Sequence, residues 1–382
     1  MKVIIEAQLV TVKTPRGMHV YAIEIIEALL KREKNEYGLA YFDYMGERNN
    51  RKCIEERYHG LNKYMFECNN MHYSYLNYDL AYYNKNYNDY INATSDVIHI
   101  PWTFNVPKNI IGNLVVTIHD LIPILPLYGV LPYGDPSIEF AHNLQRVQND
   151  NTTVVAVSQA TKADIVYYTN IPEENVHVVY NGINHDTHFP QKNIEVLRQL
   201  NVGERYFLCI GMMHESRKNF ERIIKAFEIV AEKDNDIQLV SVGVVNMQHN
   251  INNLVGESKF KDRILLLPYV RNDQKRWLLS SAVALLYPSL YEGFGLPAVE
   301  AMACGAPVIT SNNTSLPEAA GGAAILVDPY SIENMAYEME RLLNNSALSD
   351  ELIQKGLLHS AQFTWERAAK ETEKVYEAAK QN

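Results

Sequence analysis

Short apolar runs alternate with amphipathic stretches along most of this chain, and the alternation restricts the possible folds more than any other feature. The runs "KVIIEAQ", "DVIHIPW" and "NLVVTIHDL" are typical of buried strands. Between them, "HVYAIEIIEALLKR" places Val20, Ile23, Ile26, Leu29 and Leu30 at helical spacing. Strands that alternate with helices imply a parallel sheet covered by helices. The sequence therefore predicts an α/β fold.

The alternation is interrupted by a polar segment at 185–205 and then starts again. The second series contains the strands "RYFLCIGMM", "IQLVSVGV" and "VALLYPS" and the helix "KNFERIIKAFEIVAEK". A chain of 382 residues is also too long for one ordinary core. We therefore predict two doubly wound, Rossmann-like domains that face each other across a cleft, at 1–188 and 189–363, followed by a last helix at 364–380.

Charge, cysteines and hydropathy exclude several classes of protein. A formal net charge of -10 argues against nucleic-acid binding, which needs a basic face. The four cysteines form no CxxC pair, so a zinc site is not expected. The start "MKVIIEAQLV" lacks the parts of a signal peptide, and no run reaches the roughly 20 apolar residues of a membrane span. We predict a cytoplasmic protein with at most peripheral contact with the inner membrane face.

The stretch "YEGFGLPAVEAMACG" (291–305) connects a predicted strand to a predicted helix. Pro297 suits the first helical turn and Gly305 suits the end of the helix. The preceding turn would offer backbone N–H groups near the positive end of the helix dipole, which favours an anion. Glu292 and Glu300 would instead accept hydrogen bonds from hydroxyl groups, as in a nucleotide sugar. The residues alone equally allow Glu292 to cap the turn and Glu300 to be a solvated helix residue.

The spacing of Glu292 and Glu300 around "GFGLP" resembles the E-x7-E motif of retaining glycosyltransferases with the GT-B fold, and of family 4 in particular. The resemblance continues, in the family's order, through "VTIHDLIP", "AVSQATKADI", "VVYNGIN", "GMMHESRKNFERIIKAF", "APVITSNNTSLPEAAGGAAILVDP" and "FTWERAAKET". It thus covers most of the chain. It also implies that the terminal helix, 364–382, packs back on the first domain.

The resemblance implies a donor site in the second domain. Glu292 would bind hydroxyls of the donor sugar and contribute to catalysis, and Glu300 would bind the ribose. The turn would contact sugar and phosphate through residues 293–296, namely Gly293, Phe294, Gly295 and Leu296.

The same resemblance assigns the diphosphate to basic side chains. Lys218 is expected to neutralise it, with Arg217 as a second candidate. Many family members carry an arginine just after the strand glycine, where this chain has Met212. Because Met212 carries no charge, neutralisation of the diphosphate would depend more on Lys218 and Arg217.

In the first domain, the resemblance implies that His119 approaches the donor sugar near the reacting carbon as a catalytic residue. Asp120 is expected to support its loop. Gly17 and Met18 would lie near the donor, in a loop that is richer in glycine in the family. His99, Trp102 and Ser158 are candidates for the acceptor side or for the core.

The implied reaction is retaining transfer of a hexose, with mannose favoured, from a GDP or UDP sugar. The acceptor would be a glycan or lipid-linked saccharide of surface polysaccharide synthesis. No metal or other cofactor is expected, since no convincing DxD is present. Two alternatives remain, a GT-B epimerase and a catalytically silent nucleotide-sugar-binding subunit. A dinucleotide enzyme is disfavoured, because no GxGxxG follows the first strand.

Two further segments invite an interpretation. The tyrosine-rich stretch 64–96 is either compositional bias or the lining of a sugar site. The proline-rich stretch 121–136 is either a buried loop or a lid for a lipid-linked acceptor.

Overall fold

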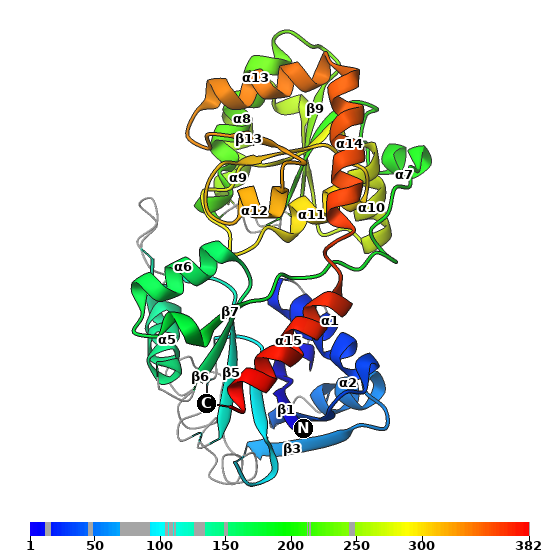
Figure 1. Cartoon of the computed structure of the whole chain (residues 1–382). Helices are drawn as coiled ribbons and strands as arrows, with labels where there is room; N and C mark the ends of the chain where they lie inside the picture. The colour runs from blue at the N-terminus through cyan, green and yellow to red at the C-terminus, as the bar shows by residue number, and fades with distance from the viewer. Residues whose placement is uncertain are drawn as a thin grey trace. The chain divides into compact units, whose positions relative to one another are not determined.

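The computed structural model describes residues 1–11, 17–44, 49–68, 92–103, 106, 110, 112–125, 134–148, 152–211, 213, 215–243 and 249–381. Met212, most of the tyrosine-rich stretch and much of the proline-rich stretch lie outside these residues. The described chain forms two compact units (Figure 1). The first contains the described residues up to Gly182 and the terminal helix from Trp365, and the second contains Ile183–Thr364. The chain thus leaves the first unit earlier than the predicted boundary after residue 188.

The first unit is built on a parallel sheet in the order β3-β2-β1-β4-β5-β6-β7. The strands are β1 (Lys2–Glu6), β2 (Glu36–Tyr44), β3 (Asn62–Cys68), β4 (Val97–Ile100), β5 (Asn113–Ile118), β6 (Thr152–Ala156) and β7 (Val176–Val178). The helices are α1 (Met18–Arg32), α2 (Asn49–Arg57), α5 (Gly134–Val147), α6 (Gln159–Tyr168) and α15 (Trp365–Ala379). The strand order reverses between β1 and β4, which is the Rossmann arrangement.

The second unit repeats this topology with the order β10-β9-β8-β11-β12-β13 (Figure 1). Its strands are β8 (Tyr206–Ile210), β9 (Gln238–Val242), β10 (Ile264–Leu267), β11 (Ala284–Tyr287), β12 (Val308–Ser311) and β13 (Ile325–Val327). Its helices are α7 (Ile194–Gln199), α8 (Phe220–Ala231), α9 (His249–Glu257), α10 (Asn272–Ser281), α11 (Leu296–Ala303), α12 (Leu316–Ala320), α13 (Ile332–Leu343) and α14 (Ser346–Ser360). The strand order reverses between β8 and β11.

The predicted α/β class, with two doubly wound parallel sheets, is confirmed. Strands such as β4 and β6 are buried along their whole length, because helices cover both faces of a parallel sheet. The prediction did not include α13 and α14. In α13, Met335, Met339 and Leu342 are buried at helical spacing and join the core of the second unit.

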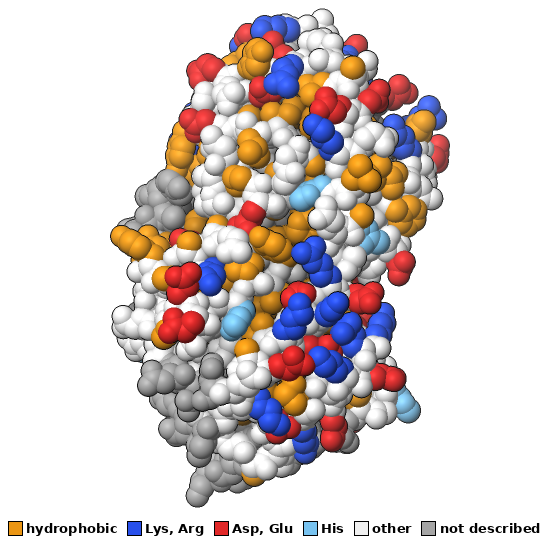
Figure 2. All heavy atoms as spheres, in the orientation of Figure 1, with side chains coloured by type: hydrophobic (Ala, Val, Ile, Leu, Met, Phe, Trp, Pro, Cys, Tyr) orange, Lys and Arg blue, Asp and Glu red, His pale blue; other side chains and the backbone are white. Residues whose placement is uncertain are grey.

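The terminal helix α15 packs beside α1 in the first unit (Figure 1). Tyr376 is fully buried, and its hydroxyl lies 2.8 Å from Nδ1 of His99. Arg32 pairs at 2.9 Å with the fully buried Glu373. At the surface, Lys34 pairs with Glu377 at 2.6 Å. Figure 2 shows basic and acidic side chains intermixed over this face, so the charges of α15 are balanced locally.

A buried carboxyl group ends strand β1 in the first unit. The side chain of Glu6 accepts the backbone N–H of Gln8 at 3.0 Å and the indole N–H of Trp102 at 3.0 Å. Burial raises the pKa of Glu6 to about 8, although both donors act in the opposite direction. Glu6 is therefore mainly protonated in the folded protein at neutral pH.

We expect Glu6→Gln to change how stability depends on pH. Because the folded pKa lies above the unfolded value of 4.5, the contribution of Glu6 to stability is complete below pH 4.5 and is lost as the pH rises through about 8. Glutamine does not titrate. The melting temperature of the variant minus that of the wild type should therefore increase between about pH 5 and pH 9. Thermal unfolding across this range measures it, and a constant difference would contradict the raised pKa.

Candidate functional site

A cluster of charged side chains lies where the strand order of the second sheet reverses. Ligands of doubly wound folds bind at this switch point, beyond the carboxyl ends of the strands. After β8, the chain forms a short turn at Ser216–Lys218 and enters α8. After β11, residues 288–295 form the longer turn that leads into α11. The neighbouring strands β8 and β11 bring the two turns to one edge of the sheet.

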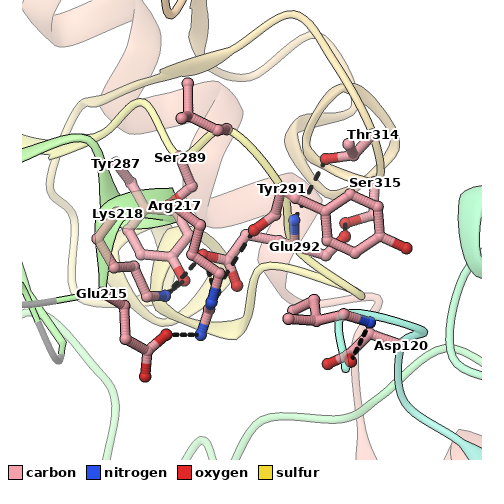
Figure 3. Close-up of polar contacts among 12 residues, drawn as sticks. Asp120, Glu215, Arg217, Lys218, Tyr287, Ser289, Tyr291, Glu292, Thr314 and Ser315 are labelled. Atoms are coloured by element: carbon pink, nitrogen blue, oxygen red, sulfur yellow. Dashed lines mark hydrogen bonds and ion pairs between the residues drawn. The ribbon is translucent and has the colours of Figure 1, made fainter. Parts of the chain in front are cut away.

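Lys218 and Arg217 point toward the carboxylate of Glu292 (Figure 3). Nζ of Lys218 lies 2.6 Å from Oε1 of Glu292, and Arg217 reaches the same oxygen at 3.0 Å. Lys218 also donates to the hydroxyl of Tyr287 at 2.8 Å, and Arg217 pairs with Glu215 at 2.5 Å. The predicted cations and the predicted sugar-binding acid are therefore in direct contact.

The electrostatics of this cluster keep its central acid ionised. Burial alone would raise the pKa of Glu292, but Arg217 and Lys218 outweigh it and hold the pKa at about 2. Burial lowers the pKa of Lys218, and Glu292 only partly compensates. The side chains of Lys218 and Glu292 are only 8% and 10% exposed, so a ligand would meet charges that are already largely desolvated.

Hydrogen bonds from the surrounding loops hold the turn before α11. The backbone N–H of Leu290 donates to the carbonyl of Arg217 at 2.7 Å. The hydroxyl of Ser315 donates to the carbonyl of Glu292 at 2.8 Å. The side-chain amide of Asn219 donates to the carbonyl of Pro288 at 3.0 Å. These bonds preorganise the charged side chains.

Gly295 is the N-cap of α11 and has a φ of 104°, which disfavours any side chain. A Cβ built there would lie 2.8 Å from Cδ2 of Leu316. We expect Gly295→Ala to lower the free energy of unfolding by about 2–3 kcal/mol, because strain and overpacking add. Denaturant unfolding measures this, with Gly256→Ala in α9 as the control, since nothing lies within 4 Å of its Cβ position. Equal stability of the two variants would contradict it.

Glu300 lies within α11, about one turn from its start, and two other elements supply its partners. Nζ of Lys275 in α10 lies 3.0 Å from Oε2, and Nε2 of His188, which precedes α7, lies 3.4 Å from Oε1. The side chain of Glu300 is 17% exposed. The alternative interpretation of Glu300 as a solvated helix residue is therefore wrong.

The other predicted residues of the second unit lie in the turn. Gly293 and Phe294 precede the N-cap Gly295, and Leu296 begins α11. Phe294 is buried, and its ring packs edge-to-face on Phe363 at 5.6 Å between centroids. The side chain of Phe294 thus packs inside the unit. Its backbone N–H is the part that the family resemblance assigns to the ligand.

In the first unit, His119 directly follows β5. Its Nε2 donates to the carbonyl of Pro101 at 3.0 Å, and its ring packs edge-to-face on Tyr21 at 4.6 Å. Burial lowers the pKa of His119 to about 4, which keeps the ring neutral at pH 7. As predicted, Asp120 supports the loop, by accepting the backbone N–H of Ile122 at 3.0 Å.

Gly17 is the N-cap of α1 with a φ of 48°, and Met18 is the first residue of that helix. Met18 is partly buried and packs against the core of the first unit. Their neighbours at 12–16 lie outside the described residues.

The three candidates for an acceptor or core role have partners within the first unit. His99 is fully buried between the hydroxyls of Tyr376 and Thr117. Ser158 is fully buried and caps α6 by accepting the backbone N–H of Thr161. Trp102 is partly exposed and donates to Glu6. The structure thus gives His99 and Ser158 core roles.

Sequence reasoning missed four participants in the charged clusters, Glu215, Tyr287, Lys275 and His188. Glu215 and Tyr287 could have been predicted from their positions. Each lies at the carboxyl end of a predicted strand or in the turn after it, where doubly wound folds bind ligands. No sequence pattern marks Lys275 or His188 as a neighbour of Glu300, since both are far from it in the sequence.

In the ranges that the structure describes, no group of three or more His, Cys, Asp and Glu side chains is arranged to hold a metal ion. Within the same ranges, every helix is too short or too polar to cross a bilayer.

Two doubly wound parallel sheets, each in Rossmann order, with charged groups at the switch point of the second, are the architecture of the GT-B class of glycosyltransferases. Residues 191–359 match the family described as "Glycosyl transferases group 1", and residues 15–187 match "Glycosyltransferase Family 4". The two matches together span most of the chain, and the protein belongs to this family of glycosyltransferases.

Two relatives and one solved structure illustrate the similarity. The serotype-specific mannosyltransferase WbdA of Escherichia coli is 28% identical over 278 residues, 70% of this chain and 34% of its own length. The O-antigen chain mannosyltransferase B of Escherichia coli is 29% identical over 228 residues, 58% of this chain and 60% of its own. The chain thus matches about a third of WbdA. HepE from Anabaena, solved with UDP-glucose, shares the fold with a TM-score of 0.75 at 16% identity, over 99% of this chain and 100% of its own.

Proposed function

We propose that this protein is a glycosyltransferase that moves a hexose, with mannose favoured, from a GDP or UDP sugar to a glycan or lipid-linked saccharide. The observation that carries the proposal is the contact of Lys218 and Arg217 with Glu292 at the switch point of the second sheet. Two cations suit a diphosphate, and a carboxylate beside them suits sugar hydroxyls. The names of the relatives favour mannose and a role in surface polysaccharide synthesis.

Each predicted donor residue receives a role in this proposal. Lys218, Arg217 and the backbone N–H groups of the turn would hold the diphosphate, helped by the dipole of α11. Glu292 would bind the sugar and Glu300 the ribose. For His119, Gly17 and Met18 we keep the roles that the family resemblance implies, near the reacting carbon and the donor.

The proposed chemistry is retaining and needs no metal. The bond between the anomeric carbon and the phosphate oxygen breaks, and the acceptor oxygen bonds to that carbon on the same face. The acceptor proton passes to the departing phosphate oxygen. Lys218 and Arg217 would stabilise the charge that develops on the diphosphate. Contact with a membrane-borne acceptor would be peripheral at most.

A thermal-shift screen with GDP, UDP and ADP tests the proposal. A ligand that binds only the folded state raises the melting temperature, by an amount that grows with its concentration over its Kd. We expect a shift with GDP or UDP. No shift with any of the three diphosphates would contradict the proposed donor site and would favour another ligand.

The stereochemical part of the proposal needs a separate measurement. We expect the product formed from an α-linked donor to carry an α-linkage, as read from its one-bond C1–H1 coupling constant. An inverted product would reject the retaining mechanism and leave the donor assignment intact. Epimerised nucleotide sugar in place of a transfer product would support the epimerase alternative.

A further inference from the structure

The carboxylate of Glu300 lies against side chains from two other segments of the second unit. Lys275 projects from α10 and places Nζ 3.0 Å from Oε2. His188 places Nε2 3.4 Å from Oε1. The three side chains are between 8% and 19% exposed. Of the two neighbours, Lys275 makes the shorter contact with the carboxylate.

The protonation of His188 decides what Oε1 can accept. Nδ1 of His188 lies 3.1 Å from the carbonyl of Asn184 and 3.0 Å from the hydroxyl of Thr187. A carbonyl only accepts, so Nδ1 carries the proton. Burial lowers the pKa of His188 more than Glu300 raises it, so the ring is neutral at pH 7. Its Nε2 then presents a lone pair to Oε1 and has no hydrogen-bond partner among the described residues.

The two oxygens of Glu300 therefore differ. Oε2 faces the ammonium group of Lys275, whereas Oε1 faces Nε2 of His188, which is also an acceptor. Two facing acceptors leave both without a hydrogen bond, and a hydroxyl group of a ligand could donate one to Oε1. We propose that Lys275 is a positioning residue for a nucleotide ribose: it holds Oε2 and thereby presents Oε1 to a ribose hydroxyl, while His188 leaves that oxygen without a competing donor. This inference rests on the proposed function, because it needs a nucleotide as ligand.

A rival role for Lys275 is direct contact with a phosphate of the ligand. The two roles differ in which part of the nucleotide they serve. A positioning role through Glu300 serves the ribose hydroxyls, so its effect disappears when those hydroxyls are removed. A phosphate contact acts equally on a nucleotide with or without them.

Calorimetric titration with GDP, UDP and the 2′,3′-dideoxy forms of both separates these roles. We expect Lys275→Met to weaken binding of the preferred ribonucleoside diphosphate by about tenfold, the value of one charge-assisted hydrogen bond. The dideoxy form should bind the wild type and the variant equally. Lys275→Arg, which keeps the charge, should restore most of the loss.

Lys355→Met in α14 is the matched control, because Lys355 pairs with Glu351 on an exposed surface and should not affect binding. Should Lys275→Met fail to fold, Lys275→Gln takes its place. An equal loss for the ribo and dideoxy ligands, or no loss at all, would overturn the positioning role. Failure of the wild type to bind either GDP or UDP would instead overturn the proposed function on which this inference rests.

Discussion

Lys218→Met is expected to weaken binding of the nucleoside diphosphate by about 10–100-fold and to lower the rate of sugar transfer by about 10²–10³-fold. Lys218 is buried at the switch point, and its ammonium group would stabilise the charge that develops as the diphosphate departs. Stability should fall less than binding, because Glu292 keeps its ion pair with Arg217 at 3.0 Å. Calorimetry with GDP or UDP and a transfer assay measure the two effects.

The control is Lys225→Met in α8. Lys225 is half exposed and pairs with Glu221 at 2.5 Å on the outer surface of that helix, so its removal should change neither binding nor transfer. If Lys218→Met kept the affinity of the wild type for the diphosphate, the assignment of Lys218 to the phosphates would fail.

Glu292→Gln is expected to separate binding of the diphosphate from transfer of the sugar. The variant leaves Lys218 and Arg217 as buried cations without their shared carboxylate, so the free energy of unfolding should fall by about 3–5 kcal/mol. A bound diphosphate neutralises the same cations. Its affinity should therefore be equal to or higher than in the wild type, while transfer falls by about 10²–10³-fold. Lys218→Met is thus expected to weaken diphosphate binding, and Glu292→Gln is not.

Glu221→Gln is the matched control, because it removes a carboxylate from an exposed pair in the same unit. A parallel loss of diphosphate affinity and transfer in Glu292→Gln would show that Glu292 acts only by keeping the site folded. An unchanged rate of transfer would remove Glu292 from the catalytic machinery.

The α/β class and the order of most elements follow from local patterns. Ile23, Ile26 and Leu29 recur every three residues, and all three lie on the buried face of α1. The strands are short and continuously apolar because helices cover both faces of each sheet. The turn before α11 was also predictable, since Pro297 and the glycine at 295 have clear positional preferences.

The partners within the site were much harder to predict. The E-x7-E spacing located Glu292 and Glu300, and the family resemblance added Lys218 and Arg217. No local pattern predicted that Lys218 and Glu292 form an ion pair, because 74 positions separate them. His188 and Lys275 carried no signal at all, although together they enclose the carboxylate of Glu300.

Local chemistry, which acts over a few residues, was enough to identify most strands, several helices, and the turn and helix that carry Glu292 and Glu300. The pairing of charges depends instead on which strands become neighbours. The crossover after β9 and β10 returns the chain to the other side of β8, so β11 pairs with β8 and the turns that follow them meet. That meeting makes Glu292 a buried acid with a pKa of about 2 beside two cations, which no local pattern encodes.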